Sequence, residues 1–148
     1  MTEFAEDELI FLPLGGSGEI GMNMNLYGFA GKWLLVDLGI TFADGEQPGI
    51  EVITPDPTYI EERRDDLAGL ILTHAHEDHL GAVAHLWPRL RCPVWATPFA
   101  AALLRNKLEE AGLLLEVPLH IIEPGEQLQI GPFGIDFIAL THSTLEMN

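Results

Sequence analysis

The chain has 148 residues, of which 47% are hydrophobic and 20% charged, and this composition indicates a folded domain rather than a disordered acidic tail. Seven basic residues face 23 acidic ones, so the formal net charge of −16, taken alone, disfavours a nucleic acid partner. The apolar runs are too short to span a membrane, and the acidic N-terminus does not resemble a signal peptide. A single cysteine, Cys92, excludes an internal disulfide, and we expect a cytoplasmic protein.

Strand patterns dominate the beginning of the chain. Residues 9–14 form an apolar run that predicts a first strand. Residues 24–29 and 32–37 flank a short turn at 30–31, which predicts a β-hairpin. The glycine-rich segment 15–21 follows a strand, but another strand comes next, so a dinucleotide-binding loop is not favoured.

The middle of the chain alternates between loops, helices and strands. Residues 39–57 are rich in glycine, proline and acidic residues and predict a long loop, a kind of segment that is usually functional. A short helix is expected near 56–62, and the apolar residues 70–73 predict a buried strand. Residues 80–87 have a helical pattern that is expected to end at Pro88.

The last third of the chain predicts one strand–helix unit followed by short strands. Residues 94–96 form a buried strand, and Thr97 is placed as the N-cap of a helix that ends at Gly112. Further strands are predicted at 120–122, 127–130 and 133–140. This order of elements predicts an α/β fold with a mixed sheet.

One segment carries the chemistry. Residues 73–79 read Thr-His-Ala-His-Glu-Asp-His, at the end of a predicted strand and the start of a helix. In an extended segment residues i and i+2 point to the same side, so His74 and His76 can converge on one metal ion. Asp78 and His79 lie where the chain turns into the helix, and their side chains can bind a second ion. Imidazole and carboxylate ligands suit Zn²⁺ or Mn²⁺, and this spacing rarely arises by chance.

Two residues elsewhere in the chain extend this candidate site. His142 follows a strand and is a fifth candidate ligand. Asp37 ends a buried strand, where its carboxylate could accept the second ring N–H of a ligand histidine and fix its tautomer. The remaining candidates are interpreted as structural or as solvated: Glu77, His85, Cys92 and His120.

The sequence resembles a known family at these positions. Residues 74–79 match the H-x-H-x-D-H signature of the metallo-β-lactamase superfamily. Five segments, in the same order as in that family, resemble bacterial ribonuclease J of the β-CASP branch: 14–23, 36–39, 48–51, 54–59 and 72–74. The resemblance implies a metallo-β-lactamase-like αββα sandwich, with a mixed sheet and flanking helices. Residues 1–148 would form the N-terminal part of that domain.

The resemblance also implies roles for the site residues. His74, His76 and His142 match the ligands of one divalent ion, with Zn²⁺ in first place and Mn²⁺ as the alternative. Asp78 and His79 match ligands of a second ion. The family's supporting aspartate is matched by Asp37. Two metals would activate a water for attack on RNA phosphodiesters, in 5′-exonucleolytic or endonucleolytic mode.

Family members are several times longer, which implies that the bridging aspartate, the last histidine ligand and the β-CASP domain lie downstream. After His142-Ser143 the chain also departs from the family pattern. We therefore expect the 148 residues alone to be inactive or nearly so, and to self-associate through exposed apolar surface. The parent protein is expected to be a homo-oligomeric RNA-processing enzyme with no membrane partner. The alternatives are another hydrolase of the superfamily, acting on a lactam or thioester, and a non-catalytic metal-binding module.

Overall fold

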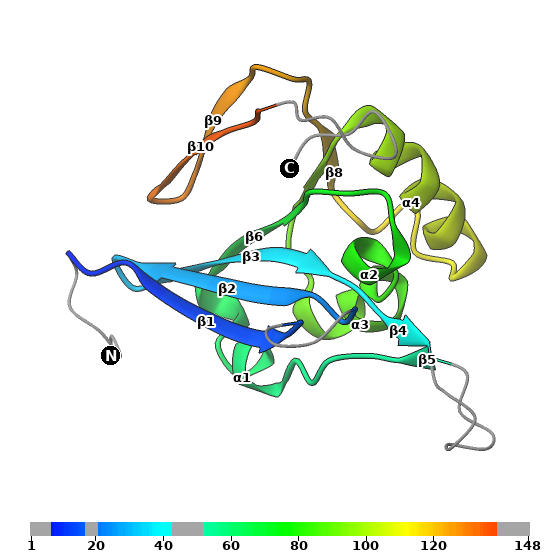
Figure 1. Cartoon of the computed structure of the whole chain (residues 1–148), viewed down its shortest axis with the longest axis horizontal. Coiled ribbons are helices and arrows are strands. Elements are labelled where there is room, and N and C mark those ends of the chain that lie inside the picture. Colours follow the sequence, from blue (N-terminus) through cyan, green and yellow to red (C-terminus); the bar gives the residue numbers. More distant parts are fainter. Residues whose placement is uncertain (1–6, 17–20, 43–51, 139–148) are drawn as a thin grey trace.

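The computed structural model describes residues 7–16, 21–42 and 52–138, and its centre is a six-stranded sheet (Figure 1). The strands, in chain order, are β1 (Ile10–Gly15), β2 (Met24–Phe29), β3 (Lys32–Leu38), β6 (Leu67–Leu72), β7 (Val94–Ala96) and β8 (Leu119–Ile121). They lie side by side in this same order. β1, β2 and β3 pair antiparallel, whereas β3, β6, β7 and β8 pair parallel. The predicted mixed sheet is confirmed.

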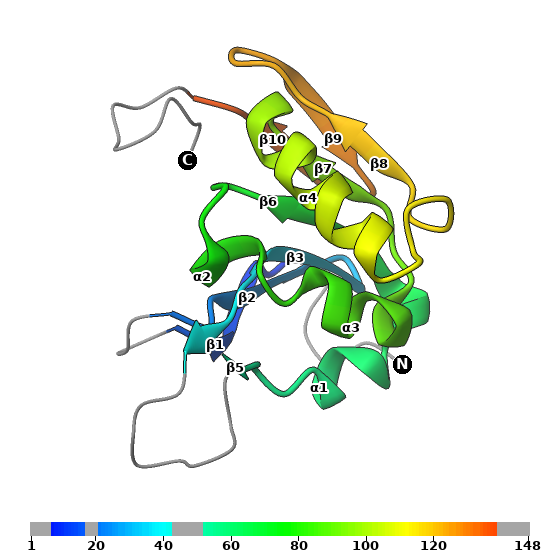
Figure 2. The ribbon, with the colours of Figure 1, turned by 90° about the vertical axis from the view of Figure 1, so that its right-hand side faces the viewer.

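Helices pack on one face of this sheet and a β-hairpin lies over the other (Figure 2). The helices are α1 (Thr58–Glu61), α2 (Glu77–Leu80), α3 (Val83–Leu90) and α4 (Pro98–Glu110), with a 3₁₀ turn, η1 (Arg64–Asp66), after α1. The hairpin consists of β9 (Gln127–Ile130) and β10 (Phe133–Asp136). The predicted α/β architecture with flanking helices is therefore confirmed.

Alternating side chains in the central strands build two apolar layers. Leu35 of β3 and Leu70 of β6 are fully buried on the helical side. Their neighbours Leu34 and Ile71 face the hairpin and pack with residues such as Phe133. Successive side chains of a strand point to opposite faces, so a strand covered on both faces is apolar along its whole length. This explains why these segments read as continuous apolar runs.

The turn and cap signals of the sequence are also confirmed. Ala30 and Gly31 have φ of 53° and 79°, as a two-residue hairpin turn requires. The Thr97 side chain accepts a hydrogen bond from the backbone N–H of Ala100 at 3.3 Å and so caps α4. Gly112, with φ of 74°, follows the end of α4. Among the described residues, no helix is both long and apolar enough to cross a membrane.

The sequence pattern predicts a helix over residues 80–87 that ends at Pro88, and this prediction is wrong. Pro88 lies inside α3, which continues to Leu90. Trp87 and Leu90 are 2% and 1% exposed, and the Trp87 indole N–H donates to the carbonyl of Cys92 at 2.8 Å. Burial of this last turn offsets the cost of a proline inside a helix, about 3 kcal/mol.

Other element ends also differ from the sequence patterns. Helix α2 ends at Leu80 and α3 begins at Val83, so the single helix predicted there is divided. The strand predicted over 133–140 ends at Asp136, and the last two of its residues lie outside the described part of the chain. The expected loop 39–57 contains a short strand pair, β4 (Thr41–Phe42) with β5 (Val52–Ile53).

Candidate metal centre at the ends of β3 and β6

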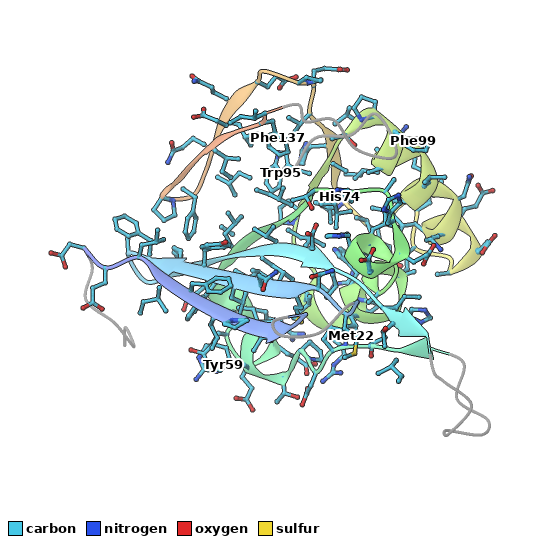
Figure 3. The ribbon with its side chains drawn as sticks, viewed as in Figure 1. Met22, Tyr59, His74, Trp95, Phe99 and Phe137 are labelled. Atoms are coloured by element: carbon cyan, nitrogen blue, oxygen red, sulfur yellow. The ribbon has the colours of Figure 1, made fainter. Side chains whose placement is uncertain are left out.

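The candidate site lies where two parallel strands end. Asp37 is near the end of β3, and Thr73 follows directly after β6. β3 and β6 are hydrogen-bonded neighbours, so their carboxyl ends meet at one edge of the sheet. His74 lies in the loop that joins β6 to α2 (Figure 3), and His76 is the N-cap of α2. The sequence cluster and Asp37 are therefore brought together, as predicted.

Asp37 is the centre of the hydrogen-bond network. It is 5% exposed, and its Oδ1 accepts a hydrogen bond from the backbone N–H of Thr73 at 2.8 Å. The Thr73 hydroxyl donates to both carboxylate oxygens, at 3.0 Å to Oδ1 and 2.7 Å to Oδ2. The Nδ1 atom of His79 lies 2.7 Å from Oδ2. Asp37 has φ of 65°, a left-handed conformation that aspartate tolerates better than most residues.

Backbone contacts hold the α2 helix against the end of β3. The amide of Ile40 donates to the carbonyl of Glu77 at 2.9 Å. The Asn23 backbone and side-chain N–H groups both donate to the carbonyl of Asp78, at 3.1 and 2.8 Å. A Cβ on Gly39 would lie only 1.7 Å from that same carbonyl oxygen. A glycine is therefore required where the two backbones meet.

Four proposed ligands lie along this loop and helix start. The ring centroids of His74 and His79 are 4.4 Å apart, and those of His74 and His76 are 5.8 Å apart. His79 Nε2 lies 3.6 Å from the Asp78 carboxylate. His74 is 8% exposed, so it belongs to the interior edge of the site. His142, the fifth predicted ligand, lies outside the described residues.

The pKa of His79 is raised above its ordinary value of 6.5. Burial is the largest single influence and lowers the pKa of this imidazole. The hydrogen bond to Asp37, together with the charges of Asp37 and Asp78, outweighs burial and favours the protonated ring. The carboxylates therefore enclose His79 in a negative environment, which also favours a bound cation.

The donor chemistry of this cluster fits a divalent metal ion. Imidazole nitrogens and carboxylate oxygens are the ligand types of Zn²⁺ and Mn²⁺. The Asp37 carboxylate contacts Nδ1 of His79, and a carboxylate at one ring nitrogen is a common arrangement behind histidines that bind metal through the other. Within the described residues, no three such side chains are arranged as a fully formed metal site.

Among the residues interpreted as structural or solvated, only the interpretation of Glu77 changes with the structure. Glu77, interpreted as a solvated acid, forms an ion pair with Lys107 of α4 at 2.5 Å. Cys92 is buried as expected, and burial raises the pKa of its thiol to about 12. His120 stacks on Trp95 with ring centroids 4.9 Å apart, which agrees with a structural role.

The sequence patterns indicate no role for Thr73 or Gly39. The hydroxyl of Thr73, directly before the first histidine of the cluster, was an available signal. The need for glycine at position 39 arises from a contact with Asp78, which lies far along the chain and could not be anticipated from local patterns.

Comparison with known proteins gives a consistent result. The family model of the metallo-beta-lactamase superfamily matches residues 21–144. The chain is 43% identical to ribonuclease J of Sinorhizobium meliloti over 145 residues, covering 95% of this chain and 26% of that protein. It is 41% identical to ribonuclease J of Synechocystis over 137 residues, covering 91% of this chain and 21% of that protein. The expected resemblance to ribonuclease J is confirmed, and the chain spans about a quarter of the length of these relatives.

Solved structures support the fold. The metallo-beta-lactamase fold protein YhfI from Bacillus subtilis aligns with a TM-score of 0.65 at 16% identity, covering 95% of this chain and 57% of that one. A diphosphatase from the PhnP family aligns with a TM-score of 0.60 at 17% identity, covering 85% of this chain and 46% of that one. At such low identity these similarities establish the architecture alone.

Proposed function

Since the chain belongs to the metallo-β-lactamase superfamily, we propose that it forms the N-terminal, metal-binding part of a metal-dependent ribonuclease. The observation that carries the proposal is the gathering of His74, His76, Asp78 and His79 at one sheet edge, with Asp37 behind His79. The similarity to ribonuclease J over 95% of the chain favours RNA as the substrate over a lactam or thioester.

The proposed ligands divide into two groups. His74 and His76, with His142, would hold one divalent ion, and Asp78 and His79 would hold the second. Zn²⁺ is proposed for both, with Mn²⁺ as the alternative. Bound divalent ions supply Lewis acidity toward a phosphodiester and offset part of the charge of −16.

The residues of the chain itself prepare the site. Asp37 accepts a hydrogen bond from Nδ1 of His79 and fixes the direction in which Nε2 points. The backbone contacts of Asn23 and Ile40 with α2 fix the position of Asp78 and His79 relative to the sheet. Rigid support of this kind reduces the reorganisation needed when ligands close around a cation.

We extend the proposal to the larger protein. Residues 1–148 would be the first portion of a metallo-β-lactamase-like domain whose remaining ligands lie in a longer, homo-oligomeric protein of the cytoplasm that processes RNA. The 148 residues alone would then bind metal incompletely and show little or no nuclease activity.

Metal binding is tested first, by titrating the 148-residue protein with Zn²⁺ in competition with a chromophoric chelator. We expect His76→Ala to weaken binding at least tenfold, as loss of a ligand does, whereas His85→Ala, at an exposed position on α3, leaves binding unchanged. Equal affinities of the two variants would contradict the assignment of the site.

Substrate class is tested with the longer protein encoded by the same gene, supplied with Zn²⁺ or Mn²⁺. We expect it to cleave a labelled single-stranded RNA, and the His76→Ala variant not to. Hydrolysis of a chromogenic lactam or of a thioester in place of RNA would replace the ribonuclease proposal with one of the alternatives.

A further inference from the structure

We propose that Thr73 is a positioning residue whose hydroxyl group holds His74 in the tautomer that presents Nε2 to a metal ion. The inference rests on the proposed metal-binding function and deepens it. In this arrangement Asp37 supports two imidazoles. It contacts His79 directly, and it holds His74 through the Thr73 hydroxyl.

The first step of the argument is the direction of one proton. The Thr73 Oγ1 atom lies 2.7 Å from Oδ2 and 3.0 Å from Oδ1 of Asp37. A carboxylate can only accept hydrogen bonds, so the hydroxyl must donate. A hydroxyl group has a single proton. Once that proton faces Asp37, the oxygen can offer only lone pairs to any other neighbour.

The second step concerns that other neighbour. The same Thr73 Oγ1 lies 3.2 Å from Nδ1 of His74. A lone pair on the oxygen requires a donor on the ring, so Nδ1 of His74 carries the hydrogen. In a neutral imidazole the second nitrogen, Nε2, then carries the lone pair that a metal ion needs.

The third step is the parallel with His79. Its Nδ1 lies 2.7 Å from Oδ2 of Asp37, so this ring is also held through Nδ1. The two ring centroids are 4.4 Å apart, and the same carboxylate supports His79 directly and His74 through the Thr73 hydroxyl. Because the two rings share one support, they are oriented together.

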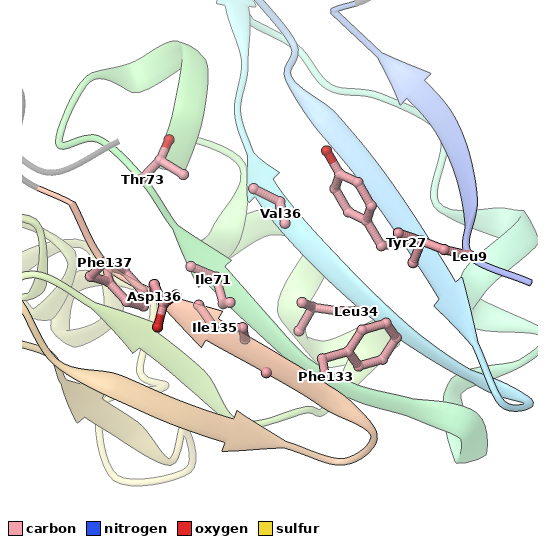
Figure 4. A pocket seen from close by; sticks show the side chains of 11 residues that line it. Leu9, Tyr27, Leu34, Val36, Ile71, Thr73, Phe133, Ile135, Asp136 and Phe137 are labelled. Atoms are coloured by element: carbon pink, nitrogen blue, oxygen red, sulfur yellow. The ribbon is translucent and has the colours of Figure 1, made fainter. Parts of the chain in front are cut away.

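Thr73 is itself held firmly enough to transmit this orientation. Its backbone N–H donates to Oδ1 of Asp37 at 2.8 Å, so both its amide and its hydroxyl are bound to the same carboxylate. A threonine side chain also has restricted χ1 freedom. Figure 4 shows Thr73 at the end of β6, two residues beyond Ile71, at the rim of a pocket of about 340 Å³ whose walls are largely apolar.

The test compares Thr73→Val, which removes the hydroxyl while keeping the shape, with Thr73→Ser, which retains it. Ring-nitrogen NMR of ¹⁵N-labelled, metal-free protein reports the tautomer of each histidine, with His74 assigned from His74→Gln. We expect the Nδ1–H form of His74 in the unaltered protein and in Thr73→Ser, and its loss in Thr73→Val. His79 should keep its Nδ1–H hydrogen bond to Asp37 in all three proteins, which controls for general damage to the site.

Zn²⁺ titration supplies the second readout. We expect about 10–100-fold weaker binding in Thr73→Val, the usual effect of losing a partner behind a ligand histidine, and recovery in Thr73→Ser. An Nε2–H tautomer of His74 in the unaltered protein overturns the inference even if Thr73→Val fails to fold. Unchanged tautomer and affinity in a folded Thr73→Val also overturn it and leave the metal site standing. An unaltered protein that binds no Zn²⁺ while His74 responds to Thr73→Val contradicts the proposed function instead.

Discussion

Asp37 combines three tasks in one buried side chain. Its carboxylate accepts hydrogen bonds from the backbone and hydroxyl of Thr73 and from the ring of His79. Its backbone takes a positive φ, which directs the chain toward Gly39 and the contact with α2. A residue with an unfavourable backbone conformation whose side chain is held by several hydrogen bonds is typical of a functional site.

Replacing Asp37 with Asn tests this arrangement. Asparagine also tolerates a positive φ, so the energetic cost of this backbone conformation stays nearly the same. The amide has one accepting oxygen in place of two, so one donor of Thr73 or His79 loses its partner. We expect the free energy of unfolding to fall by about 1–3 kcal/mol. Zn²⁺ affinity should fall by about 10–100-fold. Urea denaturation and chelator competition measure the two effects, and an Asp37→Asn protein with native metal affinity would contradict the role assigned here.

Cys92 gives a pH-dependent prediction away from the site. The pKa of its thiol is raised to about 12 by burial, so the group stays neutral in the folded protein at every pH up to well above 9. Only the thiolate reacts rapidly with a disulfide reagent. At pH 8 we expect no reaction in the native protein and complete reaction of one thiol in denaturant, measured by absorbance. Rapid stoichiometric reaction of the native protein would show that the thiol is accessible.

At the scale of elements, the sequence predicted the strands of the central sheet well because each carries its own apolar signal. β3 and β6 are apolar along their length since both faces are covered, and the turn at Ala30 and Gly31 has the residues that its backbone requires. The end of α3 was predicted wrongly, because burial of Leu90 depends on tertiary packing that no local pattern reports.

The same distinction applies to the candidate site. The sequence indicates His74, His76, Asp78 and His79 as candidate ligands because they are adjacent in sequence and chemically unusual together. For Thr73 the sequence offers only its position directly before the first histidine, since the hydroxyl group acquires its role when β6 places it beside Asp37.

The contact between β3 and α2 yields a prediction at Gly39. A methyl group there would meet the carbonyl oxygen of Asp78 at 1.7 Å, and backbone atoms cannot move aside cheaply. We expect Gly39→Ala to destabilise the fold by more than about 3 kcal/mol or to prevent folding, as overpacking of a rigid contact does.

Gly134 offers a matched control, because a Cβ there would lie 3.6 Å from the nearest atom, an ordinary contact distance. We expect Gly134→Ala to change stability by less than about 1 kcal/mol. Thermal unfolding of both variants makes the comparison. Similar melting temperatures for the two would show that α2 does not depend on its close approach to β3.

At the scale of the whole molecule, the two faces of the sheet are covered unequally. On one face, the helices and the sheet enclose a large continuous core. On the other face, the β9–β10 hairpin covers the sheet, and a pocket of about 340 Å³ is lined by residues of both. Near this pocket Leu9 is 66% exposed, and Phe11, whose ring lies 5.2 Å from that of Tyr27, is 52% exposed. Apolar surface of this kind favours association with another surface.

We therefore expect the 148-residue protein to self-associate, with an average mass in sedimentation equilibrium that rises with concentration. Phe11→Ser should shift this equilibrium toward the monomer. Leu115→Gln serves as a control, since Leu115 is 99% exposed but lies in the connection between α4 and β8. A clean monomer at high concentration, or equal effects of the two substitutions, would contradict an interface on the hairpin side of the sheet.

The bond from Thr73 to Asp37 joins residues 36 positions apart, and that from His79 to Asp37 spans 42. Neither can form until β3 and β6 have paired in parallel, which requires closure of a long loop. Contacts of such large sequence separation form slowly, so the imidazoles gain their orientation late in folding. We therefore expect metal binding to follow assembly of the sheet, so a newly made chain would pass through a stage in which the histidine cluster is present but not yet oriented.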